Sequence, residues 1–342
     1  MVDLTNYKYL QITGCYKSGT SLLFSLLDGH PDLSNFPTET SHTGYMFNQL
    51  TSSKTKHAKK IELYKSRYLR LRDRFGEKLY SDILNAFDEL SASEPYDFWK
   101  NNLFFIDAYC LCTDPDRHKN ASYYMDKSPL SYLFADQIFQ NYTNTKFIHI
   151  VREPKNNFSS IMAKFQKNKR TIIEKFRLCW RYRSWVTQSL NWAERNRIKF
   201  GEARYLVIKF EDLVTDPANV MHMISKFLDI SYENDLLSPT MMGNIYAGNN
   251  HEGVKFKSIS AININRWKER MPSFYGAVIE GFFNPNWLHY NYKNEFRPLK
   301  RKFCSFVLSI AIHLMDPFLK RYQFHGKQKR QFFAIEASDY YN

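Results

Sequence analysis

A glycine-containing loop between a predicted strand and a predicted helix constrains the fold of this chain more than any other feature. Residues 8–13 are typical of a β-strand that ends at Gly14, and leucines recur at helical spacing from Leu22 to Leu27. The loop between them is Gly14-Cys15-Tyr16-Lys17-Ser18-Gly19-Thr20-Ser21. Backbone N–H groups converge on anions where such a loop opens a helix, because they lack partners and the helix dipole adds positive charge. The sequence therefore predicts a phosphate-binding unit near its beginning.

This loop has the spacing of the G-x-x-x-x-G-K-[ST] loop of nucleoside-triphosphate-binding proteins, with one departure. Thr20 stands where an ATPase keeps its lysine, and the only lysine of the loop is Lys17. The apolar strand at residues 147–151 also lacks the Asp with which a metal-binding NTPase holds Mg²⁺. A P-loop kinase or NTPase is therefore the nearest alternative enzyme, and no metal site is predicted.

The rest of the chain alternates strands and helices. Short strands are predicted at residues 33–36, 123–125, 146–151 and 204–210, with a long helix at 171–199 and another opened by Asp216-Pro217. Such alternation implies an α/β, P-loop-like, three-layer fold, with a central, mainly parallel sheet flanked by helices. We expect one domain over residues 1–295, with a helical insertion at about 45–120, and a helical C-terminal extension over 296–342.

The loop and the residues after it resemble one known family. Tyr16-Lys17-Ser18-Gly19-Thr20-Ser21-Leu22-Leu23, followed by Leu27-Asp28-Gly29-His30-Pro31, is similar to the 5′-phosphosulfate loop and first helix of sulfotransferases that use 3′-phosphoadenosine-5′-phosphosulfate (PAPS). The resemblance implies that Lys17 contacts the bridging and sulfuryl oxygens of PAPS and that 3′,5′-ADP is the product. It also implies cofactor-binding roles for the rest of the loop: Tyr16, Ser18, Gly19, Thr20 and Ser21.

A second segment, residues 151–160, is similar to the element with which this family binds the 3′-phosphate. Arg152 and Ser160 have the spacing of the two residues that contact it. Arginine offers a planar pair of donors to a phosphate, and Pro154 starts a helix whose N-terminus adds its dipole. Residues 210–213 and 265–268 also resemble family segments; Glu211 and Asp212 are expected to serve structure.

The resemblance also suggests the groups that perform the transfer. Glu39 lies where glycan and tyrosylprotein sulfotransferases keep a catalytic Glu, so Glu39 is the predicted general base. The alternatives are His42, because cytosolic sulfotransferases use a His, and a loop with no role in proton transfer. Lys127, in Asp126-Lys127-Ser128-Pro129, is predicted to be a second cation at the transferred group, the alternative being a surface ion pair. The expected reaction is metal-free, in-line transfer to a hydroxyl of a glycan, a glycolipid or a secondary metabolite.

The composition limits the other function classes. A net charge of +14 favours an anionic partner, although solubility alone also explains surplus lysine. A basic nucleic-acid-binding protein is thus a second alternative, but no recognition helix, zinc finger or RNA-binding motif supports it, and no nucleic-acid partner is expected. Five cysteines without paired spacing argue against disulfides and zinc. No signal peptide precedes the first strand, so a cytoplasmic location is expected.

The C-terminal extension concentrates much of this charge. Residues 297–330 hold nine basic side chains and one acid, which gives +9 − 1 = +8. The apolar run at 303–315 is too short to span a bilayer. Two interpretations stay open, a peripheral membrane contact and a helix packed on the domain or on a partner. The aromatic residues near the end of the insertion are similarly ambiguous between acceptor binding and core packing: Tyr96, Phe98, Trp99, Phe104 and Phe105.

Overall fold

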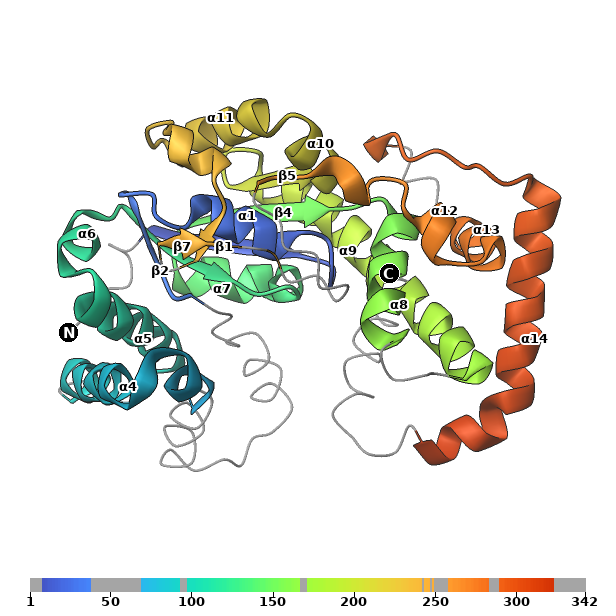
Figure 1. The fold of residues 1–342 in the computed structure, drawn as a ribbon, viewed down its shortest axis with the longest axis horizontal. Helices are drawn as coiled ribbons and strands as arrows, with labels where there is room; N and C mark the ends of the chain where they lie inside the picture. The colour runs from blue at the N-terminus through green and yellow to red at the C-terminus, as the bar shows by residue number, and fades with distance from the viewer. Residues whose placement is uncertain are drawn as a thin grey trace.

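The protein is built around a parallel β-sheet (Figure 1). The computed structural model describes residues 8–37, 69–92, 97–166, 171–241, 243–246, 248, 258–282 and 289–322. The strands follow the order β2-β3-β1-β4-β5, and each neighbouring pair is parallel. Their bounds are β1 Lys8–Gly14, β2 Leu33–Asn35, β3 Tyr123–Lys127, β4 Asn144–Val151 and β5 Tyr205–Lys209.

The alternation of side chains along β1 and β4 explains why both faces of the sheet are covered. Leu10 and Ile12 pack on one face, whereas Tyr9 belongs to the core cluster of the other face. A sheet buried on both sides is typical of parallel strands joined by helical crossovers. The predicted α/β class is confirmed. β5 ends one residue earlier than predicted, because Phe210 already begins a helix.

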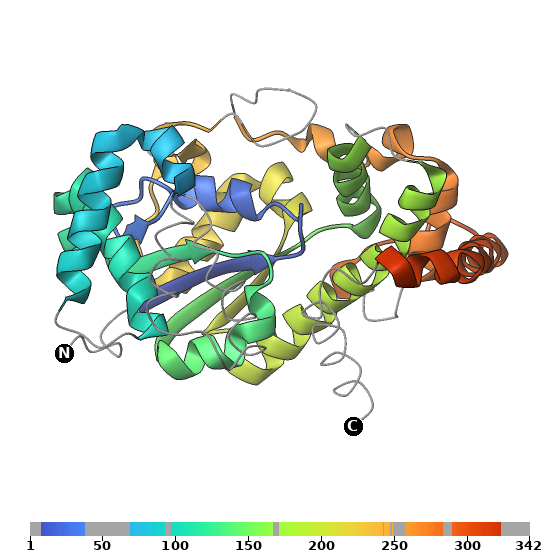
Figure 2. The ribbon, with the colours of Figure 1, turned by 90° about the horizontal axis from the view of Figure 1, so that it is seen from below.

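Two helical layers enclose the sheet (Figure 2). One layer contains α1 (Thr20–Leu27), α10 (Phe210–Thr215) and α11 (Pro217–Leu228), which Asp216 caps as its sequence predicted. The other contains α7 (Ala135–Asn141) and the long α9 (Ile172–Phe200), whose N-terminus carries a capping box. The predicted three-layer arrangement is therefore also confirmed.

Helices occupy the described part of the predicted insertion. They are α4 (Leu69–Ser91), which is kinked at Gly76, α5 (Phe98–Thr113) and α6 (Pro115–Asn120). Phe104 and Phe105 of α5 are buried in the core cluster that also contains Tyr9 of β1. These two rings are core residues, so they are not available to line an acceptor site.

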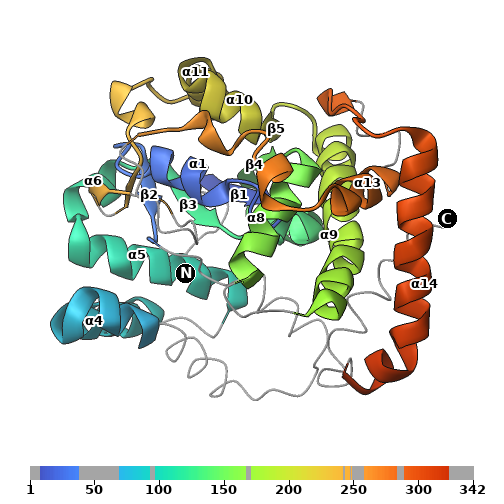
Figure 3. The same cartoon turned by 45° about the vertical axis from the view of Figure 1, so that its right-hand side comes forward.

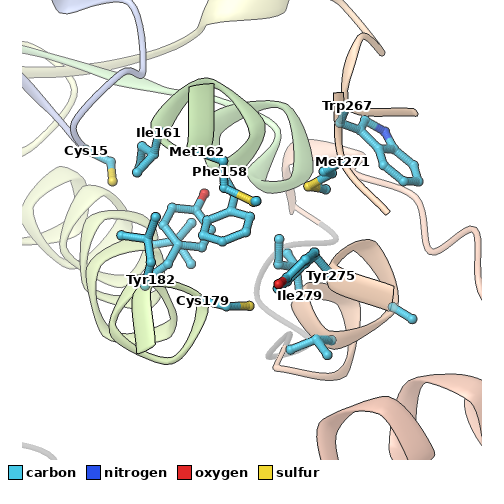
Figure 4. Close-up of a cluster of buried hydrophobic side chains, with 14 of the residues drawn as sticks. Cys15, Phe158, Ile161, Met162, Cys179, Tyr182, Trp267, Met271, Tyr275 and Ile279 are labelled. Carbon is cyan, nitrogen blue, oxygen red and sulfur yellow. The ribbon is translucent and has the colours of Figure 1, made fainter. Parts of the chain in front are cut away.

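The opposite end of the molecule is also helical (Figure 3). α8 (Pro154–Gln166) and α9 pack with α12 (Trp267–Arg270), α13 (Ser273–Gly281) and α14 (Pro298–Tyr322). Figure 4 shows Phe158 of α8, Tyr182 of α9 and Tyr275 of α13 in this cluster. The ring centroids of Phe158 and Tyr182 lie 4.8 Å apart. The remaining elements are short: helical turns at Ser131–Phe134, Asn234–Leu237 and Ala261–Asn263, and the antiparallel pair β6 (Thr240–Met241) and β7 (Asn244–Ile245).

Two further expectations concern single features. All five cysteines are free, and four of them are buried, while Cys112 is partly exposed. The prediction of unpaired thiols is therefore confirmed. Among the helices that the structure describes, none combines the length and the apolar character required to cross a membrane.

Candidate functional site

The predicted binding residues gather at the carboxyl ends of the central strands. β1 leads into the Gly14–Ser21 loop, β3 ends at Lys127, and β4 ends just before Arg152. β1 lies between β3 and β4, so β2 and β3 are on one side of it and β4 and β5 on the other, and the strand order reverses at this point. Ligands of open α/β sheets bind at such a switch point, because the loops on its two sides diverge there.

The loop is compact because glycine occupies its two tightest positions. A Cβ on Gly14 would lie 2.4 Å from the carbonyl oxygen of Ile150, and one on Gly19 would lie 2.5 Å from the Phe210 ring. The φ angle of Gly19 is 111°, which also favours glycine. Lys17 has a φ of 65°, which is in the left-handed region. This backbone conformation is strained for a lysine, so the surrounding residues must hold it in place.

The polar residues of the loop differ in how they face the site. Tyr16 is 43% exposed, and Thr20 begins α1. The Ser18 hydroxyl is fully buried and has no hydrogen-bond partner among the described residues, while its N–H donates to the Cys15 carbonyl. Ser18 therefore lies within the loop, and Thr20 and Ser21 lie in the first turn of the helix that follows it.

Lys127 reaches the loop from the neighbouring strand. Its Nζ donates to the Ser21 hydroxyl over 3.1 Å and lies 5.8 Å from the centroid of the Phe24 ring. The side chain is almost completely buried, with 8% exposure. Lys127 is thus a buried lysine at the start of α1 and not a surface lysine.

Arg152 approaches the loop from the other side. Its Nη1 donates to the Lys17 carbonyl over 2.9 Å, and its guanidinium lies over the Phe210 ring at 4.2 Å from the centroid. Its Nε is buried and makes no hydrogen bond with the described residues. Burial lowers the pKa of Arg152, and the positive charge of Arg270 contributes in the same direction, while Glu211 opposes the shift. A guanidinium with an unmade buried donor fits an anionic ligand such as a phosphate.

Ser160 lies in the second turn of α8. Its hydroxyl donates to the carbonyl of Asn156 over 3.0 Å, the bond that a helical serine makes when it turns back on its own helix. The same helix holds the loop through Asn157, whose Nδ2 donates to the Tyr16 carbonyl over 2.9 Å. Asn157 is a positioning residue that the sequence analysis missed, because its importance depends on a contact 141 residues away.

A buried network of charges fixes the N-terminus of α8. The Lys155 Nζ is 2.7 Å from Glu280 Oε1, 3.1 Å from Glu295 Oε1 and 3.6 Å from Glu153 Oε1. Burial opposes the charge of Lys155, but the three carboxylates outweigh it and raise its pKa. Lys155 is only 1% exposed, so this cluster joins α8 to α13 and to the segment before α14.

Glu153 and Glu211 link this network to the end of β5. The Glu153 N–H donates to Glu211 Oε1 over 2.9 Å, and the Tyr292 hydroxyl donates to Glu211 Oε2 over 3.2 Å. The expectation that Glu211 serves structure agrees with these bonds. Burial raises the pKa of Glu153 to about 7, although Lys155 and the N–H of Asn156 oppose the shift.

Some of the predicted site residues lie outside the described part of the chain, and some residues beside the site were not predicted. Glu39 and His42 fall within residues 38–68, which the structure does not describe. Phe210 and Arg270 were not predicted as site residues, although Phe210 is the last residue of a predicted strand that borders the site. In the described residues, no group of three or more His, Cys, Asp or Glu side chains is placed to hold a metal ion.

Similarity to known proteins agrees with this arrangement. Residues 10–234 match the model of the sulfotransferase family, which is more than half of the chain. No curated protein sequence matches significantly. Among solved structures, the sulfotransferase domain from the curacin biosynthetic pathway matches with a TM-score of 0.51 and 18% identity, covering 84% of this chain and 98% of that one.

Two other solved structures match with lower TM-scores. The sulfotransferase domain of the Synechococcus PCC 7002 olefin synthase has a TM-score of 0.47 and 21% identity, covering 82% of this chain and 95% of its own. A mouse sulfotransferase complexed with PAP has a TM-score of 0.38 and 14% identity, covering 94% and 90%. The curacin-pathway domain supports the fold, and the family match spans the loop, Lys127, Arg152 and Ser160. The chain belongs to the sulfotransferase family.

Proposed function

We propose that this protein transfers the sulfuryl group of PAPS to a hydroxyl of an acceptor molecule. The observation that carries the proposal is the convergence of three cationic residues on one loop. Lys17 belongs to the loop, Lys127 contacts Ser21 at its end, and Arg152 contacts the Lys17 carbonyl. PAPS carries anionic groups at both its 5′ and 3′ positions, and the site offers positive charge on both sides of the loop.

The two lysines suit the 5′ end of the donor. Transfer breaks the bond between sulfur and the bridging oxygen, which keeps the electron pair, and forms a bond from sulfur to the acceptor oxygen. Lys17 and Lys127 would stabilise the charge that develops on that bridging oxygen, since preorganised cations in a site with little water act most strongly there. The first turn of α1 would hold the 5′-phosphate with its N–H groups and the hydroxyls of Thr20 and Ser21.

Arg152 suits the 3′-phosphate. Its stacking on Phe210 and its bond to Lys17 fix the guanidinium plane, and its Nε remains available to an anion. The positive charge of Arg270 lies close enough to lower the pKa of Arg152, and Arg270 would add positive charge to the same subsite. Ser160 would contribute its hydroxyl, which then turns from the Asn156 carbonyl towards the phosphate.

We assign the general base to Glu39, which accepts the acceptor hydroxyl's proton as the new S–O bond forms; His42 is the alternative. The proposed acceptor class rests on the resemblance of the Glu39 position to that of the catalytic Glu in glycan sulfotransferases: a glycan or glycolipid hydroxyl comes first, and a secondary-metabolite hydroxyl second. Changing Glu39→Gln should leave PAPS affinity nearly intact and lower turnover by about 10²-fold or more. Unchanged turnover would remove Glu39 from the mechanism.

The donor is tested by binding before any acceptor is known. Isothermal titration with 3′,5′-ADP should show binding that PAPS competes and that DNA and ATP do not. Lys17→Met and Arg152→Ala should each weaken binding at least about tenfold, since each removes a charge-assisted contact to an anion. Lys199→Met is the matched control, because Lys199 pairs with Asp136 on the surface. ATP turnover without dependence on PAPS would instead identify a kinase or NTPase.

A further inference from the structure

The outer face of α14 is an exposed apolar surface with no role in the proposed reaction. Five of its large apolar residues are strongly exposed: Leu299 (81%), Phe303 (63%), Phe306 (63%), Ile310 (43%) and Leu314 (74%). With 3.6 residues per turn, these positions fall within an arc of about 80°. We call this set the apolar stripe. A contiguous apolar surface of this kind marks an interaction site more often than scattered exposed residues do.

The stripe is additional to the face that holds α14 in the fold. Cys304, Leu308 and Ile312 are buried in the cluster that α14 shares with α9 and α13. Those three positions lie on the opposite side of the helix from the stripe, because they are offset by about half a turn. Figures 1 and 3 show α14 as one long helix at the outer edge of the molecule. The helix is thus anchored by one face and presents a second apolar face to solvent.

The charges around the stripe are of one sign. Lys300 and Lys302 are exposed, and helical geometry places them on either side of the stripe, about 40° from its edges. Residues 297–315 contain four basic side chains, Arg297, Lys300, Arg301 and Lys302, and no acid. An apolar face bordered by lysines is the pattern of a helix that lies in the interface of an anionic membrane.

A second copy of the chain is a poorer occupant than a lipid surface. Residues 297–322 hold six basic side chains and one acid, so two α14 helices would oppose cations in either orientation. We therefore propose that α14 binds the protein peripherally to anionic lipid membranes through the apolar stripe and its bordering lysines.

Vesicle co-sedimentation of the full chain tests this proposal. The protein should pellet with phosphatidylcholine vesicles that contain about 30% phosphatidylserine, and at least about tenfold less with phosphatidylcholine alone. The double variant Phe303→Glu/Phe306→Glu should lower the partition coefficient at least about tenfold, because it removes two rings from the lipid and adds negative charge. Lys300→Gln/Lys302→Gln should lower it about three- to tenfold and reduce its salt dependence.

The matched control is Ile198→Glu/Ile245→Glu, which changes two isolated apolar residues that are 70% and 75% exposed. This variant should pellet as the unchanged protein does. Circular dichroism and thermal unfolding establish that each variant is folded, and binding of 3′,5′-ADP should be the same in all of them. No pelleting of the unchanged protein, or equal pelleting of the stripe and control variants, would overturn the proposal. A dimer in light scattering that only the stripe variant abolishes, without vesicle binding, would also overturn it.

Discussion

The two anion-facing elements of the site are held in place by different kinds of interaction. The Gly14–Ser21 loop owes its shape to glycines and to neighbouring strands, because a Cβ at Gly14 would meet the β4 backbone. The N-terminus of α8 depends instead on acidic side chains from distant parts of the chain, such as Glu280, which accepts from Lys155, and Glu211, which accepts from the Glu153 N–H. One site thus combines a sterically fixed half, the Gly14–Ser21 loop, with an electrostatically fixed half, the N-terminus of α8. The two halves should respond differently to mutation and to pH.

The largest effect is expected from the electrostatic half. Glu280→Ala removes the closest carboxylate of Lys155 and the acceptor of the Glu295 and Phe296 N–H groups. Breaking a buried ion pair in this way should lower the free energy of unfolding by about 3–5 kcal/mol. Urea denaturation measures the change, and the affinity for 3′,5′-ADP should fall as the α8 N-terminus loses its support.

The control for Glu280 is an ion pair that is open to solvent. Glu194→Ala removes the bond to Arg197 within α9, where both side chains are about one-third exposed. Its cost should be below about 0.5–1 kcal/mol, with no change in nucleotide affinity. Equal losses of unfolding free energy in the two variants would show that the buried network stabilises the fold no more than a surface ion pair does.

The steric half should be broken by one added carbon atom. Gly14→Ala places a Cβ 2.4 Å from a backbone oxygen, which cannot move without displacing β4. Overpacking of this kind should cost about 2–4 kcal/mol in thermal or urea unfolding and weaken nucleotide binding. Gly29→Ala is the matched control, since its φ is also positive at 89° but its nearest neighbour would be 3.7 Å away. It should cost only about 1–2 kcal/mol.

The pH dependence of stability should distinguish the two halves further. Burial raises the pKa of Glu153 to about 7, from 4.5. The folded state therefore binds the proton more tightly than the unfolded state, so this contribution to stability is complete below about pH 4.5 and is lost as pH rises through 7. Glu153→Gln should remove about 1–3 kcal/mol of that decline between pH 5 and 8.

The free energy of unfolding is measured between pH 5 and 8 in the unchanged protein and in Glu153→Gln, and the slopes of the two curves against pH are compared. Asp107, whose pKa burial raises to about 6, has the same sign and should keep its share of the slope in the Glu153 variant. The diagnostic interval is therefore pH 6–8, where Glu153 titrates in the folded state. Burial lowers the pKa of His149 to about 3, so His149 contributes a slope of the opposite sign up to its ordinary pKa of 6.5, and this slope is the same in both proteins. The same slope in both proteins over this interval would exclude a raised pKa of Glu153.

The smallest effect is expected where the two halves meet, at Phe210. Phe210→Leu removes the aromatic face under Arg152, so the affinity for 3′,5′-ADP should fall about three- to tenfold. Trp192→Leu is a close control, because Arg195 lies over that ring at the same 4.2 Å, but on α9. Calorimetry should find no change of affinity in the control, and a change equal to that of Phe210→Leu would exclude a specific role for the Phe210 ring.

Features that depend on neighbouring residues could be predicted before the fold was known. The strand–loop–helix unit at residues 8–27, the parallel sheet and the free cysteines follow from local periodicity and spacing, and the structure confirms them. Arg152 and Lys127 were identified by their segments, and the structure brings both to the loop. The roles of Glu39 and His42 stay predictions, since they lie outside the described residues.

The distant side chains that support the site could be identified only from the folded chain. Asn157 contacts Tyr16, and Glu280 contacts Lys155, each more than 100 positions away in the sequence. Phe210 lies against Gly19, also more than 100 positions away, and under Arg152, which is 58 positions away. The tertiary structure also decided that Phe104 is core and that α14 keeps a second apolar face exposed. The physical reason is that local propensity encodes elements within a few residues, whereas burial and charge pairing depend on strand order and helix packing.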